Sequence, residues 1–210
     1  MRSIYVVLRF DHVIMTVSDL DAASKRLFDE YGLGSVAGGR HPGHGTANRL
    51  VPLGRDYLEF VAVVDPSEAA GSAFGRWVGA RALMGSLAGL CLRTTDIISI
   101  GRRLDLAPVP MSRMRPDGIE LSWHLLGLDV AIEEGLPFFV EWDVLPQDHP
   151  GRAFASHRVE PRGISWVEVG GDAGRLGNWL GNHDLDVRST DGPPGVLRFG
   201  LDTDAGQLVI

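Results

Sequence analysis

The chain has 210 residues, and 44% of them are hydrophobic, so it can bury a substantial core and general disorder is excluded. Its 20 Lys and Arg face 27 Asp and Glu, for a formal net charge of -7, and no dense basic block could follow a phosphate backbone. No segment approaches the roughly 20 uninterrupted apolar residues of a spanning helix, and Cys91 is the only cysteine. We therefore expect a cytoplasmic protein without nucleic acid, membrane anchor or disulfide.

The first expected elements are a strand at 10–17 and a helix that begins after Asp19 and ends at Gly32. Two further strands are expected at 47–53 and 56–64. We name residues 1–66 module one, and we interpret its strand, helix and two further strands as a copy of a βαβββ unit, in which two or three strands follow the helix.

The remaining elements repeat that order. A short connecting helix is expected at 67–84, followed by module two at 85–144, a proline-rich connecting loop at 145–162, and a truncated module three at 163–210. The expected strands of module two are 87–93, 111–115, 119–127 and 137–143, with a turn at 116–118. Those of module three are 164–169, 185–188, 196–201 and 207–210.

The repeat is clearest in the helices. An aspartate precedes an apolar stripe that falls one, four and eight residues later in all three modules, and these aspartates are about 77 residues apart. We expect an α+β fold of tandem βαβββ modules whose curved mixed sheets carry the helices packed outside. The aspartates and their stripes are Asp19 with Leu20, Ala23 and Leu27; Asp96 with Ile97, Ile100 and Leu104; and Asp172 with Ala173, Leu176 and Leu180.

Three chemically active residues lie within expected strands: His12, Glu59 and Glu141. A carboxylate in an otherwise apolar strand needs a partner, and a metal ion is one such partner. Strand parity puts His12 on one face with Ile14, and Glu59 on one face with Tyr57.

The polar segment at 38–49, followed by Leu-Gly-x-x-Tyr-Leu-Glu at 53–59, resembles the signature of the glyoxalase-like family in the vicinal oxygen chelate superfamily (glyoxalase, bleomycin resistance, dioxygenase). The resemblance implies paired modules that form a cup, with a divalent metal held by the first and last strands of each module. It implies His12, Glu59 and Glu141 as metal ligands, with Glu59 and Glu141 also catalytic. The metal would be Zn, Mn, Fe or Ni.

The fourth ligand position of this pattern is not filled. Aligning Asp96 with Asp19 places Gly89 opposite His12, and glycine has no ligating side chain. In module three, Ser165 and Val209 stand at the positions of His12 and Glu59. The alternatives for completing the shell are water or one of His41, His44 and His124.

The polar segment itself is the expected substrate-binding element, because its glycines let a ligand approach the backbone and its side chains donate hydrogen bonds to a carboxylate, enolate or phosphate. A polar surface hairpin is the alternative interpretation. Glu133 and Glu134 are expected in a solvated turn. The expected substrate-binding residues are Arg40, His41, His44, Thr46, Asn48 and Arg49.

The resulting hypothesis is a metal-dependent lyase, isomerase or dioxygenase that acts on a small oxygen-rich metabolite. A metal-free binding or resistance protein of the same fold is the alternative, favoured by Gly89, Ser165 and Val209, and a structural or regulatory subunit is a third. Pairing of modules one and two is favoured over pairing of one and three, because it would unite Glu59 with Glu141. A homodimer is also considered, since relatives often complete their cups across a dimer.

Overall fold

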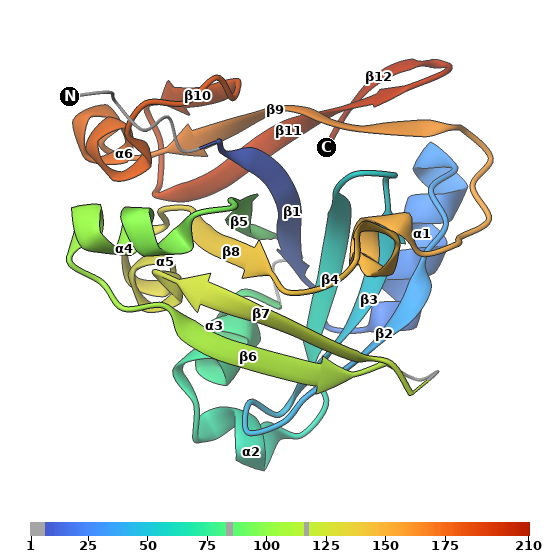
Figure 1. Ribbon diagram of the computed structural model, residues 1–210. Coiled ribbons are helices and arrows are strands. Elements are labelled where there is room, and N and C mark those ends of the chain that lie inside the picture. The colour runs from blue at the N-terminus through green and yellow to red at the C-terminus, as the bar shows by residue number, and fades with distance from the viewer. Residues whose placement is uncertain (1–6, 83–85, 116–117) are drawn as a thin grey trace.

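The computed structural model describes residues 7–82, 86–115 and 118–210; most of the turn expected at 116–118 and the end of the expected connecting helix lie outside them. Two mixed β-sheets dominate (Figure 1), which confirms the α+β class. One has eight strands in the order β2-β3-β4-β1-β5-β8-β7-β6, and the other has four in the order β10-β9-β11-β12. The boundaries of the three modules stay a prediction.

Modules one and two share the eight-stranded sheet. Strand β1 (Arg9–Thr16) runs antiparallel to β5 (Leu87–Arg93), and Val13 pairs with Leu90 near the middle of this ladder. Each of these strands then has a parallel neighbour, β4 (Tyr57–Val63) or β8 (Phe138–Trp142). The other strands of the sheet are β2 (Val36–His41), β3 (Thr46–Pro52), β6 (Val109–Met114) and β7 (Glu120–Leu126).

Apolar side chains on the two faces of this sheet form separate clusters. The larger one joins Val13, Phe60 and Phe139 to helices α1 (Leu20–Tyr31) and α4 (Ile97–Leu104) and to the second sheet. The smaller one joins the opposite face to helices α3 (Ala73–Ala82) and α5 (Leu128–Glu134). The second sheet therefore covers the outer, convex face and leaves the inner, concave face to α3 and α5.

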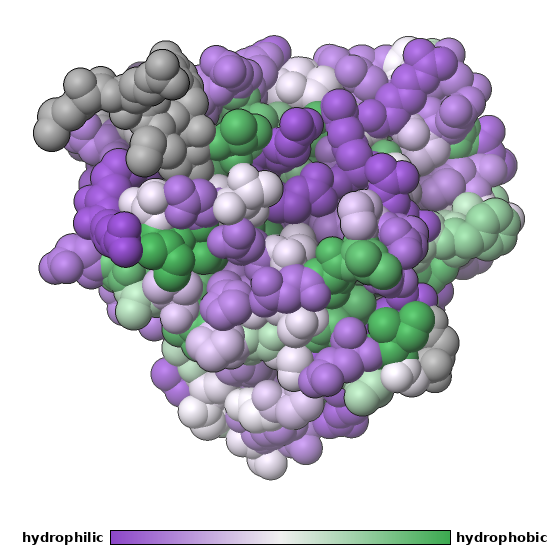
Figure 2. All heavy atoms as spheres, viewed as in Figure 1, coloured by the Kyte–Doolittle hydropathy of each residue, from purple (hydrophilic) through white to green (hydrophobic). Residues whose placement is uncertain are grey.

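The second sheet contains the strands of module three. These are β9 (Pro161–Gly170), β10 (Val187–Thr190), β11 (Gly195–Thr203) and β12 (Gly206–Val209), with helix α6 (Ala173–Leu180) beside them. In the view of Figure 1 this sheet lies across the top of the molecule. Figure 2 shows the same face, where hydrophilic residues cover most of the visible area and hydrophobic residues lie in small separate patches.

The three repeated aspartates begin helices as their spacing predicts. Asp19 accepts hydrogen bonds from the amides of Asp21 and Ala22, Asp96 from that of Ser99, and Asp172 from that of Arg175. Each side chain satisfies amides that the first helical turn leaves without partners.

Some local expectations were wrong. Glu133 and Glu134 end helix α5 and are exposed there, so they do not form a turn. The connecting helix is two helices, α2 (Pro66–Ala70) and α3. Among the described residues, no helix is long and apolar enough to cross a membrane.

Candidate functional site

A cavity of about 220 Å³ lies on the concave face of the eight-stranded sheet. Because successive strand residues point to opposite faces, every second residue of a strand can reach it. Module one lines it mostly with polar groups and module two mostly with apolar ones. The side chains lining it include His12, Arg40, His41, His44, Asn48, Tyr57 and Glu59, and opposite them Met111, Arg113, Trp123, Leu125, Phe138, Val140 and Trp142.

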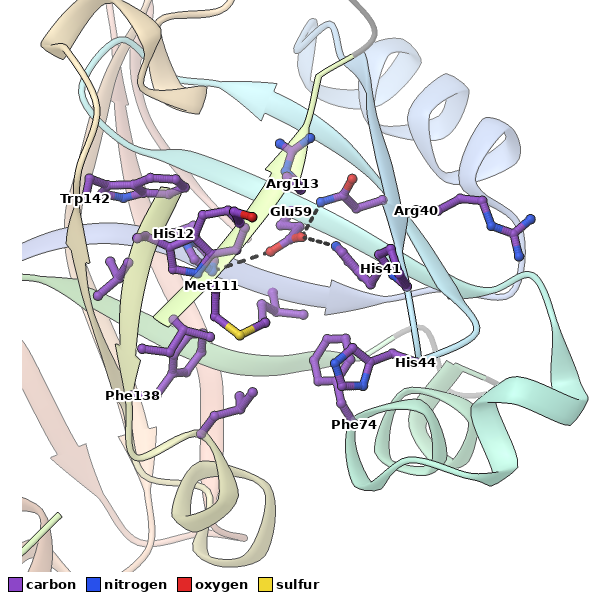
Figure 3. Close-up of a pocket in the computed structure, with 18 of the residues that line it drawn as sticks. His12, Arg40, His41, His44, Glu59, Phe74, Met111, Arg113, Phe138 and Trp142 are labelled. Carbon is purple, nitrogen blue, oxygen red and sulfur yellow. Dashed lines mark hydrogen bonds and ion pairs between the residues drawn. The ribbon is translucent and has the colours of Figure 1, made fainter. Parts of the chain in front are cut away.

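Glu59 is the centre of the polar half of the cavity. Its side chain is only 10% exposed. The Nε2 atom of His12 lies 3.4 Å from Oε2, and the Nε2 atom of His41 lies 3.7 Å from Oε1 (Figure 3). Asn48 donates a hydrogen bond from Nδ2 to Oε1 at 2.5 Å. The structure thus brings together residues of four strands around one carboxylate.

The amide of Asn48 is held in one orientation. Its Oδ1 accepts a hydrogen bond from the backbone N–H of Gly39 at 2.7 Å, so Nδ2 is the atom that faces Glu59. Gly38 permits this approach, because a Cβ there would lie 1.9 Å from Oδ1 of Asn48. The paired glycines of the polar segment therefore position Asn48.

His12 is oriented from behind by Asp11, a residue that sequence reasoning did not single out. The Nδ1 atom of His12 lies 2.7 Å from Oδ1 of Asp11, which is completely buried. Burial by itself would raise the pKa of Asp11, but hydrogen bonds from His12 and His149, and their charges, lower it well below 3.8. An ionised carboxylate only accepts, so His12 donates from Nδ1 and directs Nε2 at Glu59.

Two further donors hold Asp11 in place. His149 accepts a hydrogen bond from the backbone N–H of Gly151 at its Nδ1, so its Nε2 carries the hydrogen that is donated to Oδ2 of Asp11 at 2.9 Å. Trp142 donates to the same oxygen from Nε1 at 3.0 Å. Asp11 therefore connects His149, in the loop before module three, to His12 in the cavity.

His41 has a similar arrangement. Its Nδ1 lies 2.9 Å from Oγ1 of Thr46, and its Nε2 faces Glu59. Burial lowers the pKa of His41 below 6.5, although the nearby Glu59 carboxylate opposes this. The imidazole of His41 is therefore neutral at neutral pH.

The other expected substrate-binding residues are divided between two places. Arg40 and His44 line the cavity, whereas Thr46 supports His41 from its buried position. Arg49, also expected to bind substrate, does not line the cavity, because its side chain turns to the opposite face of β3. There it pairs with Asp21 at 2.9 Å and donates to Ser35 at 3.0 Å.

Glu141, expected as a ligand and catalyst, does not line the cavity, so the structure does not bring it together with His12 and Glu59. Its neighbours Val140 and Trp142 line the cavity, but its Oε2 accepts a hydrogen bond from the backbone N–H of Ile97 at 2.9 Å. That amide begins helix α4, so Glu141 stabilises the start of a helix.

Strand register identifies the residue that does correspond to Glu59. Ile14 of β1 pairs with Glu59, and Cys91, which is equivalent to Ile14, pairs with Phe138. Module two therefore offers Gly89 and Phe138 where module one offers His12 and Glu59. Neither can ligate a metal, so the residues present do not fit the four-ligand site that the resemblance implies.

Two other sets of donor atoms do not fit a metal ion either. His12 and His41 face different oxygens of Glu59, and their atoms are not gathered as one ion requires. Among the described residues, Asp11, His12 and Cys91 alone bring three candidate atoms within 4.8 Å of one another. There the oxygens of Asp11 already accept hydrogen bonds, and burial raises the pKa of the Cys91 thiol well above 9.0, so it keeps its proton.

The apolar wall was missed by sequence reasoning. Its residues alternate along β7 and β8, at 123 and 125 and at 138, 140 and 142, and Met111 of β6 lies on the same face. The available signal was the presence of apolar residues at every second position of these strands. This pattern identifies the residues on one face of the sheet, but it does not tell whether that face is the concave one. Aromatic rings here offer flat contacts for an apolar part of a ligand.

Comparison with known proteins agrees with this fold. A hypothetical protein from Staphylococcus aureus matches 90% of the chain with 88% of its own, at 20% identity and a TM-score of 0.70. Methylmalonyl-CoA epimerases match less: one from Streptomyces coelicolor in complex with 2-nitronate-propionyl-CoA covers 66% of the chain with 99% of its own (17% identity, TM-score 0.48). One from Mycobacterium tuberculosis covers 70% of the chain with 95% of its own, at 20% identity and a TM-score of 0.47.

No curated protein sequence matches the chain. The family model described as "Glyoxalase-like domain" matches residues 10–181, which is most of the chain. The chain therefore belongs to the glyoxalase-like domain family.

Proposed function

We propose that the protein is an enzyme that moves a proton on a small molecule bound in the cavity, with Glu59 and His12 as the groups that exchange the proton. The proposal rests on one observation. Nε2 of His12 and Oε2 of Glu59 face each other at 3.4 Å, while ionised Asp11 holds the far side of the imidazole. Both groups can accept a proton, and at this separation a proton that one of them takes up can pass directly to the other.

The chemistry is that of a carbon acid. The Glu59 carboxylate takes a proton from a carbon next to a carbonyl, and the electron pair of that C–H bond becomes the enolate. His12 can accept the proton in turn, and its return to a different atom or face isomerises the substrate. With Thr46 donating to its Nδ1, neutral His41 can donate from Nε2 to the enolate oxygen. Because module two supplies no ligand, no step of this proposal uses a metal.

Proton exchange in D₂O tests the proposal. We would follow the loss of proton NMR signal next to the carbonyl of two probes, phenylpyruvate and 4-phenyl-2-butanone. We expect exchange faster than the buffer background, unchanged after treatment with a chelator. Glu59→Gln should lower the rate at least about 100-fold, as loss of a general base does. Glu133→Gln, at an exposed position on α5, is the control.

A second function is favoured by the apolar residues of module two. Phe138 and its apolar neighbours give that half of the cavity a surface for binding without chemistry, as in a metal-free binding or resistance protein, and Gly89 supplies no ligating side chain. This function requires ligand binding but no proton exchange. Normal binding of the probes with background exchange in the wild type would replace the enzyme proposal with this one.

A further inference from the structure

Arg113 lies at a seam of the eight-stranded sheet. The edge strands β2 and β6 approach each other, and Nη1 of Arg113 lies 3.2 Å from where a Cβ of Gly39 would be. Arg113 lines the main cavity on one side (Figure 3). It also lines a second cavity of about 410 Å³, which includes Arg115, His149 and Arg152. The side chain of Arg113 therefore lies between the two cavities.

One nitrogen of this guanidinium has no hydrogen-bond partner in the part of the chain that the structure describes. Among the described residues, Nη1 of Arg113 is buried and makes no hydrogen bond, and no carboxylate lies within 4 Å of the side chain. Two other arginines beside these cavities do have acidic partners: Arg40 pairs with Glu68 at 3.9 Å and Arg115 with Asp148 at 3.7 Å. A buried N–H of a charged group without an acceptor is costly, so a ligand that supplies the acceptor is bound more tightly.

The lining of the cavity also matches a ligand that has one apolar end and one polar end. Trp123, Phe138 and Trp142 form an apolar wall, and Glu59 lies across from them in the polar half. An apolar body on the aromatic rings would leave its polar end toward the seam. A planar carboxylate matches the fork of a guanidinium, and each charge-assisted hydrogen bond adds to affinity.

We infer that Arg113 binds the carboxylate of a small organic acid whose apolar body lies on the aromatic wall of the main cavity. This inference rests on the proposed function for the site but names its substrate class. It makes Arg113 a specificity-determining residue, because the same compound without a negative charge loses the charge-assisted, two-oxygen pairing with the guanidinium.

A matched pair of probes tests the inference. Calorimetric titration would compare 3-phenylpropanoate with its neutral isostere 3-phenylpropanamide at pH 7. We expect the wild type to prefer the carboxylate by about 10- to 100-fold, the effect of one or two charge-assisted hydrogen bonds. Arg113→Gln should remove this preference, because carboxylate affinity should fall by about that factor and amide affinity by much less. Arg152→Gln, which removes an exposed arginine of the second cavity only, should keep it.

Further variants keep the test independent of folding and of catalysis. Gly39→Val retains the charge of Arg113 but displaces its guanidinium, so it should also reduce the preference. Glu59→Gln should abolish proton exchange yet leave a preference for the carboxylate, so the two proposals can fail separately. Equal affinity of the wild type for both probes, no binding of either up to about 10 mM, or a preference that survives in a folded Arg113→Gln variant would overturn the inference.

Discussion

Asp56 should make the stability of the protein fall as the pH rises from about 4 to 7. It lies at the start of β4, 1% exposed, and accepts hydrogen bonds from the backbone N–H of Ile164 in β9 at 3.1 and 3.2 Å. Burial raises its pKa from 3.8 to about 7, although that hydrogen bond and Arg55, 3.6 Å away, oppose the rise. The hydrogen bonds of Asp56 thus link the two sheets, and burial favours the protonated form of its carboxyl group.

The direction of this change in stability with pH follows from proton binding. Between pH 3.8 and about 7 the folded chain keeps the proton of Asp56 and the unfolded chain loses it, so this contribution to stability is complete below pH 3.8 and lost as the pH rises to about 7. A tenfold change in a protonation equilibrium corresponds to about 1.4 kcal/mol, so the loss is at most about 4 kcal/mol. Asp56→Asn keeps an oxygen for Ile164 without the buried charge.

We therefore expect Asp56→Asn to match the wild type in free energy of unfolding at pH 5 and to exceed it by about 2 kcal/mol at pH 8. Urea unfolding at both pH values, followed by circular dichroism, measures the difference. Asp186→Asn, at an exposed ion pair with Arg188, is the control and should show no such change. The reasoning is refuted if the Asp56 variant differs from the wild type equally at both pH values, or if it is the less stable protein at pH 8.

Three more predictions follow from the site. Asp11→Asn should cost about 3 kcal/mol in urea unfolding, because it removes the charged partner of His149 and His12 in a fully buried network; a loss below about 0.5 kcal/mol would contradict this. Glu141→Ala should cost about 1 kcal/mol, the typical effect of losing a helix cap, and leave probe affinity unchanged; weaker probe binding would return Glu141 to the site. Purified protein should hold less than about a tenth of an equivalent of transition metal, and Mn, Ni, Zn or Fe should not raise its melting temperature; a stabilising metal would refute our reading of module two.

The parts of the fold that were predictable are those with a local signal. A capping aspartate and an apolar stripe at helical spacing lie within ten residues of one another, and both are visible in the sequence. Helix α5 lacked that signal, because Gly127 begins it without a side-chain cap. Strand β2 contains Gly38, Gly39 and Arg40, and it is a strand because β3 pairs with it across an irregular register.

The site was predictable where it depended on neighbours in one strand and not where it depended on register. His12 and Glu59 were found by residue type and parity. Glu141 was taken as the equivalent of Glu59 because it is also a glutamate in the last strand of its module. The equivalent position is that of Phe138, and it can be identified only from the pairing of β8 with β5. The role of Arg113 follows from the approach of two edge strands distant in the sequence.

The two apolar clusters on opposite faces of one sheet have a consequence for protein engineering. Since adjacent strand residues serve different clusters, the inner positions of β7 and β8 can be varied while their outer neighbours keep the main core packed. A library randomised at positions 123, 125, 138 and 140 would sample new ligand specificities within one conserved scaffold.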